Sequence, residues 1–196
     1  MARRPLLKDE ERRLFFGIPD DPDGLARQYT FTRSDQDLVA ARRGTANQLD
    51  FAVQLALLRH PGLGLARMEE PVGVLVEWLA AQLGIPAAAL ADYAARPQTM
   101  TDHALMLATT LGLRPPGNSD LPLMIEAAAQ SAWSTGRGAP VVAGVIAALR
   151  TAKIILPAPA ISCGSGPPRP QISAAPSISA RRESLRDPRL TQSVRP

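Results

Sequence analysis

The chain of 196 residues is long enough for one or two domains, and its single cysteine, Cys163, excludes an intramolecular disulfide framework and a cysteine-cluster metal site. Charges interrupt every apolar run before about 18 residues, so we expect a cytoplasmic protein without a signal peptide, a membrane-spanning helix or a membrane partner. The net charge of +4 does not by itself indicate a nucleic-acid partner. Residues 1–160 carry 16 basic and 16 acidic side chains, and the whole excess of positive charge lies in residues 161–196.

The composition changes near residue 160 and predicts two parts. Residues 1–160 alternate periodic apolar segments with short glycine and proline breaks, and aromatic residues make up only 4% of the chain, which favours an all-α domain. In residues 161–196, serine, proline, arginine and glycine supply 21 of 36 positions. Such a segment buries too little apolar surface to offset the entropy of ordering it, so we expect a disordered tail.

The helices of the first part are expected to form a mostly antiparallel assembly with short connections. Residues 47–59 are apolar over so wide an arc that they predict the central helix, against which the others pack. Trp78 and Trp133 occupy apolar positions of expected helices and are assigned to the core. Residues 153–157 are expected either to pair as a short strand or to close the domain. The expected helices are 8–16, 20–29, 34–42, 47–59, 72–83, 87–95, 102–111, 121–134 and 140–152.

Motifs for catalysis, metal or cofactor binding are absent or better explained by local structure. Gly62-Leu-Gly64 begins like a dinucleotide fingerprint, but Arg67 stands at the third glycine position and a helix precedes it. His60 is expected to cap the C-terminus of the central helix as a cation. His103 beside Asp102 is a weak candidate general base, since no nucleophile lies nearby. We therefore predict no enzyme, no metal and no cofactor.

Basic side chains before residue 60 are the remaining functional candidates. The expected helices 34–42 and 47–59, joined by a turn at Gly44-Thr45, give the N-terminal part a helix-turn-helix-like order. Arginines on such a turn suit phosphate contacts, although Arg42 and Arg43 also complement a helix C-terminus. On the residues alone, a DNA-binding module and a helical protein-interaction module are nearly equal. The candidate DNA-binding residues are Arg3, Arg4, Arg42, Arg43 and Arg59.

Several stretches resemble the N-terminal domain of the large replicative transposases of the Tn3 family. They are Met1-Ala-Arg-Arg-Pro-Leu-Leu, Leu25-Ala-Arg-Gln-Tyr-Thr, Lys153-Ile-Ile-Leu-Pro157 and, most specifically, the run from Phe51-Ala-Val-Gln-Leu to Arg59-His-Pro-Gly62. The resemblance spans residues 1–160. Two positions depart from it: Asp50 stands where a small residue is expected, and Met100 stands where the family often has an arginine.

The resemblance implies a function and a limit to it. It implies sequence-specific binding of double-stranded DNA at transposon terminal inverted repeats, with transposase subunits as further partners and the bacterial nucleoid as location. The family's RNase H-like domain with its Asp/Asp/Glu magnesium site lies far downstream and is missing from these 196 residues, so the chain is expected to bind DNA without cutting it. Residues 161–196 do not resemble the family, which suggests a frameshift or truncation near 160–163. A non-functional remnant and a protein-interaction module remain the alternatives.

Overall fold

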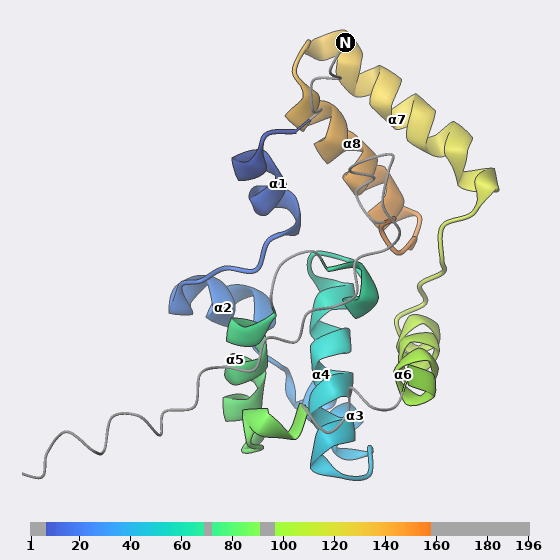
Figure 1. Ribbon diagram of the computed structural model, residues 1–196. Coiled ribbons are helices and arrows are strands. Elements are labelled where there is room, and N and C mark those ends of the chain that lie inside the picture. Colours follow the sequence, from blue (N-terminus) through green and yellow to red (C-terminus); the bar gives the residue numbers. More distant parts are fainter. Residues whose placement is uncertain (1–6, 69–71, 91–96, 158–196) are drawn as a thin grey trace, which may run out of the picture.

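The computed structural model describes residues 7–68, 72–90 and 97–157, and this part of the chain is helical (Figure 1). The fold is all-α, as the sequence predicts. The predicted disordered tail, 161–196, lies outside the described residues. The helices are α1 Asp9–Phe16, α2 Pro22–Tyr29, α3 Arg33–Ala40, α4 Thr45–Arg59, α5 Gly73–Leu83, α6 Pro97–Thr110, α7 Leu121–Ser134 and α8 Gly138–Thr151, with short 3-10 helices η1 Leu65–Arg67, η2 Ala87–Leu90 and η3 Asn118–Asp120.

Most helix ends lie within two residues of the expected positions, and the differences include the start of α3, the start of α6 and the alanine-rich segment. The third helix starts at Arg33 because the Thr32 hydroxyl, rather than Ser34, accepts a hydrogen bond from the Asp35 backbone N–H, while the Asp35 carboxylate accepts one from the Thr32 N–H. α6 begins at Pro97, five residues before the expected start at Asp102. The alanine-rich segment expected as a helix is a 3-10 turn, η2, in its described part, and residues 91–95 lie outside the described residues.

α4 is the centre of the core, as predicted. Every residue from 49 to 58 is buried, and α3, α5, α6 and η2 pack around the helix (Figure 1). A helix that is apolar on all sides gains burial energy only when neighbours enclose it, so the wide apolar arc read from the sequence explains this position. Two polar side chains, Asp50 and Gln54, are buried with it.

One amide side chain fixes the link between α2 and α3 against α5. The Gln82 side chain accepts a hydrogen bond from the Phe31 backbone N–H at 3.0 Å and donates one to the Tyr29 carbonyl at 2.9 Å. Both partners lie about fifty residues earlier in the chain, and both side chains, Tyr29 and Phe31, are buried. The two bonds give hydrogen-bond partners to backbone groups in the link between α2 and α3, where the helical hydrogen-bond pattern is interrupted.

The segment after α8 closes the described domain. Arg114 and Ile154 form an isolated parallel bridge, and the Leu156 N–H donates to the Gly62 carbonyl at 2.9 Å. Ile154 and Leu156 are buried, at 2% and 1% exposure. Of the two alternatives for residues 153–157, closing the domain is correct, because the pairing does not extend beyond the single bridge in the described residues.

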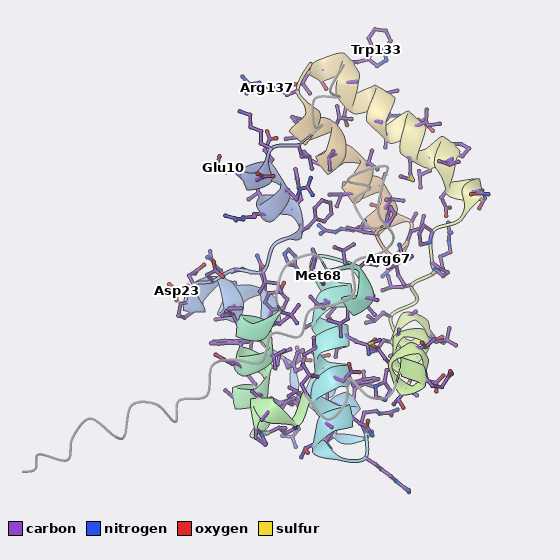
Figure 2. All side chains as sticks on the ribbon, viewed as in Figure 1. Glu10, Asp23, Arg67, Met68, Trp133 and Arg137 are labelled. Atoms are coloured by element: carbon purple, nitrogen blue, oxygen red, sulfur yellow. The ribbon has the colours of Figure 1, made fainter. Side chains whose placement is uncertain are left out.

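α7 and α8 form a hairpin that stands apart from the other helices (Figure 1). α8 joins the core through Ile146 and Leu149, whereas no residue of α7 is buried. The core assignment of Trp133 is wrong, because its side chain is 91% exposed and points away from the hairpin (Figure 2). Trp78, by contrast, packs against the core on α5. The difference arises because, among the described helices, α8 is the main neighbour of α7 and leaves the Trp133 side uncovered.

Candidate nucleic-acid interface

The turn between α3 and α4 holds Arg42 in a defined position. Its guanidinium carbon lies 5.0 Å from the centre of the Phe51 ring on α4, and its Nη1 donates a hydrogen bond to the Met106 sulfur on α6 at 2.9 Å. An arginine stacked on an aromatic face is ordered before it meets an anion, so binding costs less side-chain entropy. Arg42 therefore joins three helices and presents a positive charge at their meeting point.

Arg43 and the start of α4 continue this surface. Gly44 precedes α4 with φ +84° and offers no side chain to cap it, and the first turn of α4 contains no acid. Side chains of α4 hold the backbone carbonyls of the turn. The Asn47 amide donates to the Arg43 carbonyl at 2.8 Å, and the Gln48 amide donates to the Arg42 carbonyl at 2.9 Å. The exposed Arg43 thus lies beside a positive helix end, an arrangement that attracts anions.

Arg59 is engaged with a carboxylate. Its Nη1 and Nη2 donate to the two oxygens of Asp35 at 2.6 and 2.5 Å, which ties the end of α4 to the start of α3. Burial by itself would raise the pKa of the Asp35 carboxyl, but hydrogen bonds from Arg59 and Thr32 outweigh it and lower the pKa. The pair offsets the Arg59 charge, so among the candidate arginines this one has a structural task.

The structure separates the five candidate arginines. Arg42 and Arg43 lie together on the α3–α4 turn, whereas Arg59 lies at the opposite end of α4. Arg3 and Arg4 lie outside the described residues. Because residues 49–58 of α4 are buried, the exposed parts of α4 are its first turn and Arg59 at its end, and the helix-turn-helix-like order cannot place the length of α4 in a DNA groove.

His103 takes part in a buried polar cluster rather than in a surface site. Its Nδ1 lies 3.1 Å from Asp50 Oδ2, its ring meets the Phe51 ring edge-on at 5.3 Å, and Gln54 donates to the same carboxylate oxygen at 2.6 Å. The histidine is 7% exposed and Asp50 is fully buried. The expected neighbour Asp102 points elsewhere, to Gln98. Asp50, which departs from the resembled pattern, joins α4 to α6.

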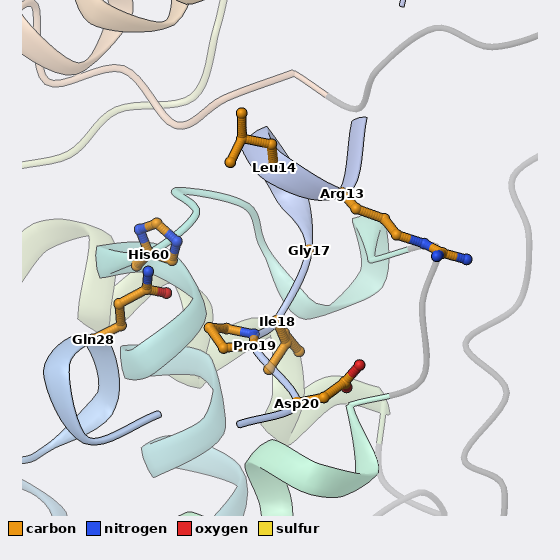
Figure 3. A pocket seen from close by; sticks show the side chains of 8 residues that line it. All are labelled: Arg13, Leu14, Gly17, Ile18, Pro19, Asp20, Gln28 and His60. Atoms are coloured by element: carbon orange, nitrogen blue, oxygen red, sulfur yellow. The ribbon is translucent and has the colours of Figure 1, made fainter. Parts of the chain in front are cut away.

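A cleft of 570 Å³ lies between α1, α2 and the end of α4 (Figure 3). Arg13 and Asp20 bring opposite charges to its lining, and Arg13 extends away from His60 (Figure 3). Burial and then the charge of Arg150 lower the pKa of His60, which disfavours the charged ring that the sequence predicts at this end of α4. A cation is nevertheless present there, because Arg150 donates to the Pro61 carbonyl at 2.8 Å. The cleft concentrates no single sign of charge.

Two features are absent from the described residues. No three His, Cys, Asp or Glu side chains in residues 7–68, 72–90 and 97–157 come together as ligands for a metal ion. None of the helices in that part of the chain combines the length and apolarity that crossing a bilayer requires.

Comparison with known proteins gives a consistent result. The family described as "Domain of unknown function (DUF4158)" matches residues 6–161. The chain is 37% identical over 158 residues to the transposase for transposon Tn3926 of Escherichia coli, and 38% identical over 158 residues to the transposase for transposon Tn501 of Pseudomonas aeruginosa. It is 32% identical over 155 residues to the transposase for transposon Tn1546 of Enterococcus faecium.

The matches cover most of this chain and little of the relatives. They span 81%, 81% and 79% of the chain, respectively, and 16% of each relative. The similarity therefore concerns one segment of much longer proteins. The match also ends at residue 161, next to the composition change that the sequence places at residue 160.

Proposed function

This chain belongs to the DUF4158 family and matches the N-terminal domain of Tn3-family transposases, and from this we propose that it acts in DNA transposition by binding double-stranded DNA. The finer proposal is sequence-specific recognition of transposon terminal inverted repeats. The observation that carries it is the 37% identity over 158 residues to a protein named for its transposon. DNA is the substrate of every transposase, so a segment with this identity is expected to take part in binding DNA.

The α3–α4 turn is the proposed contact surface. We assign Arg42 and Arg43 to the DNA phosphates, since the first is ordered over Phe51 and the second is exposed beside the first turn of α4. Arg3 and Arg4 remain proposed phosphate contacts on charge and position. Arg59 is proposed to contribute less, because Asp35 holds its guanidinium. Base contacts in the major groove would come from the first turn of α4, where Thr45 is exposed.

Recognition and strand cleavage are assigned to different segments of the transposases. We assign residues 1–160 to recognition and propose that residues 161–196 form a separate, disordered part. Strand cleavage is assigned to the portion of the relatives that this chain does not match, about 84% of their length, since the match covers 16% of it. Other transposase subunits are the proposed protein partners, and association with the nucleoid follows if DNA binding does.

Fluorescence anisotropy tests the proposal. The full chain is titrated with the inverted repeat that flanks its own gene and with a scrambled duplex, from about 50 to 200 mM salt, and a chain ending at Ala160 is measured beside it. We expect tighter binding to the repeat, retained by the shorter chain. Equal binding to both duplexes that disappears with residues 161–196 would contradict recognition by the helical domain. Absence of any affinity would favour a protein-interaction module or an inert remnant.

A further inference from the structure

The outer side of α7 is an apolar surface that nothing in the described chain covers. With about 100° per residue, six positions besides Pro122 fall on one side of the helix, and among them Leu121, Ile125 and Trp133 are 51%, 66% and 91% exposed. Figure 2 shows Trp133 pointing into open space at the end of the hairpin. We call this surface the α7 stripe; it consists of Leu121, Ile125, Ala128, Ala129, Ala132 and Trp133.

Charge is nearly absent from this hairpin. Residues 121–151 contain three charged side chains, Glu126, Arg137 and Arg150, and none of them belongs to the stripe. A surface helix of a monomer normally turns its polar side to water, and contiguous exposed apolar patches of this kind mark association sites. The stripe therefore indicates a partner with an equally uncharged, helical surface.

The stripe and the α8 contact form two separate seams on α7. A Cβ placed on Gly144 of α8 would overlap Ser131 Oγ and contact the Ala127 carbonyl, so α8 packs closely on the Ala127–Ser131 side of α7. That side lies about 110° around the helix from the centre of Leu121, Ile125, Ala128 and Ala132. Two seams roughly at right angles are what a helix of a four-helix bundle has, with one neighbour on each.

We propose that the α7 stripe pairs with the α7 stripe of a second copy of this chain, antiparallel, so that two α7–α8 hairpins form a four-helix bundle. Leu121, Ile125, Ala128 and Ala132 follow the 4-3-4 spacing of a coiled-coil seam. Within this four-residue seam, the two large side chains come first and the two alanines last. Antiparallel pairing places Leu121 opposite Ala132 and Ile125 opposite Ala128, so each large side chain meets a small one.

Self-pairing also fits the charge and the area of the stripe. The positions that flank the seam, Pro122, Met124, Ala129 and Ser131, are uncharged, so two copies approach without like-charge repulsion. α7 is about 21 Å long, and its exposed side offers on the order of half of the roughly 800 Å² that each partner contributes to a standard interface. We therefore expect a dimer with a dissociation constant in the micromolar range. This inference is independent of DNA binding.

Sedimentation equilibrium of the full chain tests the pairing. The mass should rise from monomer toward dimer between about 1 and 200 µM. Ile125→Lys places a charge in the seam and should abolish dimers, whereas Gln130→Lys, which places the same charge on α7 away from the stripe, should leave them intact. Both positions are exposed, and unchanged thermal unfolding at low concentration verifies the fold. A monomer at every concentration, or dimers that survive Ile125→Lys, would overturn the proposal.

Disulfide cross-linking tests the antiparallel orientation. In a Cys163→Ser chain, Leu121→Cys and Ala132→Cys are made separately, mixed and oxidised. Antiparallel pairing should yield the mixed dimer, with one chain of each variant, far in excess of either homodimer. Predominant homodimers would instead require parallel α7 helices and would overturn the proposed arrangement. Dimers with no preference between the two pairings would show that the chains associate through another surface.

Discussion

The carboxylate of Asp35 and the guanidinium of Arg59 join the first turn of α3 to the last turn of α4 through two hydrogen bonds of 2.6 and 2.5 Å. Asp35 is 2% exposed, and the same carboxylate caps α3 through Thr32. Asp35→Ala should therefore lower the free energy of unfolding by about 1–3 kcal/mol, because it removes a cap and leaves Arg59 without its partner. Urea unfolding measures the change. Asp37→Ala, an exposed aspartate on the same helix, should cost less than about 0.5 kcal/mol.

Acid should destabilise the domain through Asp120 as well as Asp35. The Arg114 side chain and then the Gly117 N–H lower the pKa of Asp120 to about 2, against an ordinary 3.8, and the pKa of Asp35 is lowered too. A carboxyl with a depressed pKa in the folded state stabilises fully above its ordinary pKa, and this contribution disappears as the pH falls through the folded value. Asp120→Asn should therefore lower stability at pH 7, and the difference from the unmodified chain should shrink as the pH falls toward 2 and vanish below it. A difference that stays constant across this range would contradict the ion pair.

Arg43 should act on DNA affinity without acting on stability. Arg43→Ala should weaken binding to all duplexes about equally and reduce the slope of log K against log salt by about one, since one phosphate contact is lost. Thermal unfolding should not change, because the side chain is exposed. Arg59→Ala provides the contrast: it should lower the unfolding temperature. A loss of affinity confined to one base position would show that Arg43 reads sequence instead.

His103 and Asp50 should be energetically coupled. Their side chains are buried and 3.1 Å apart, and removing either one leaves the other without this contact in a region of low dielectric. A double-mutant cycle with Asp50→Ala and His103→Ala, measured by urea unfolding, should give a coupling of about 1–3 kcal/mol. Asp102→Ala should have little effect, because that carboxylate is exposed. A large effect at Asp102 would restore the pairing that the sequence alone indicated.

Gly62 should tolerate no side chain. Its φ is +99°, and an added Cβ would lie 3.3 Å from Leu156 Cγ, in the segment that closes the domain. Gly62→Ala should therefore cost about 1–3 kcal/mol. Gly64, two residues later, has φ −73° and open space around it, so Gly64→Ala should be neutral in the same unfolding measurement. Equal effects at the two glycines would argue against the packing of Leu156.

The sequence predicts correctly the features that local signals determine. The 3.6-residue periodicity located α4 and its central place, because an all-round apolar helix has no stable position except inside. Capping residues and glycine or proline breaks locate most helix ends to within two residues. Asp21, at the start of the helix expected at 20–29, accepts a hydrogen bond from the Gly24 backbone N–H at 2.7 Å. The family resemblance was likewise carried by a contiguous stretch, 51–62, that can be read directly along the chain.

The features that the sequence does not reveal depend on contacts between distant segments of the chain. The sequence does not reveal the pairing of Arg59 with Asp35, because Asp35 lies 24 residues earlier. It sets His103 beside Asp102, whereas the structure places His103 against Asp50, 53 residues away. Trp133 was assigned to the core because periodicity identifies an apolar side of a helix without saying whether a neighbour covers it. The buried Asp50 was noted only as a departure, although a carboxylate inside an apolar helix already signals a partner across a helix contact.

The attachment of the α7–α8 hairpin has a consequence for motion. The hairpin joins the core through Ile146, Leu149 and the Arg114–Ile154 bridge, and the turn between α7 and α8 lies at the far end of the hairpin from α4 (Figure 1). Because α7 has no buried residue and the core contacts lie on α8, we expect the hairpin to open more readily than the rest of the domain. Amide hydrogens of α7 are therefore expected to exchange with solvent through openings confined to the hairpin, while those of α4 exchange only when the whole domain unfolds.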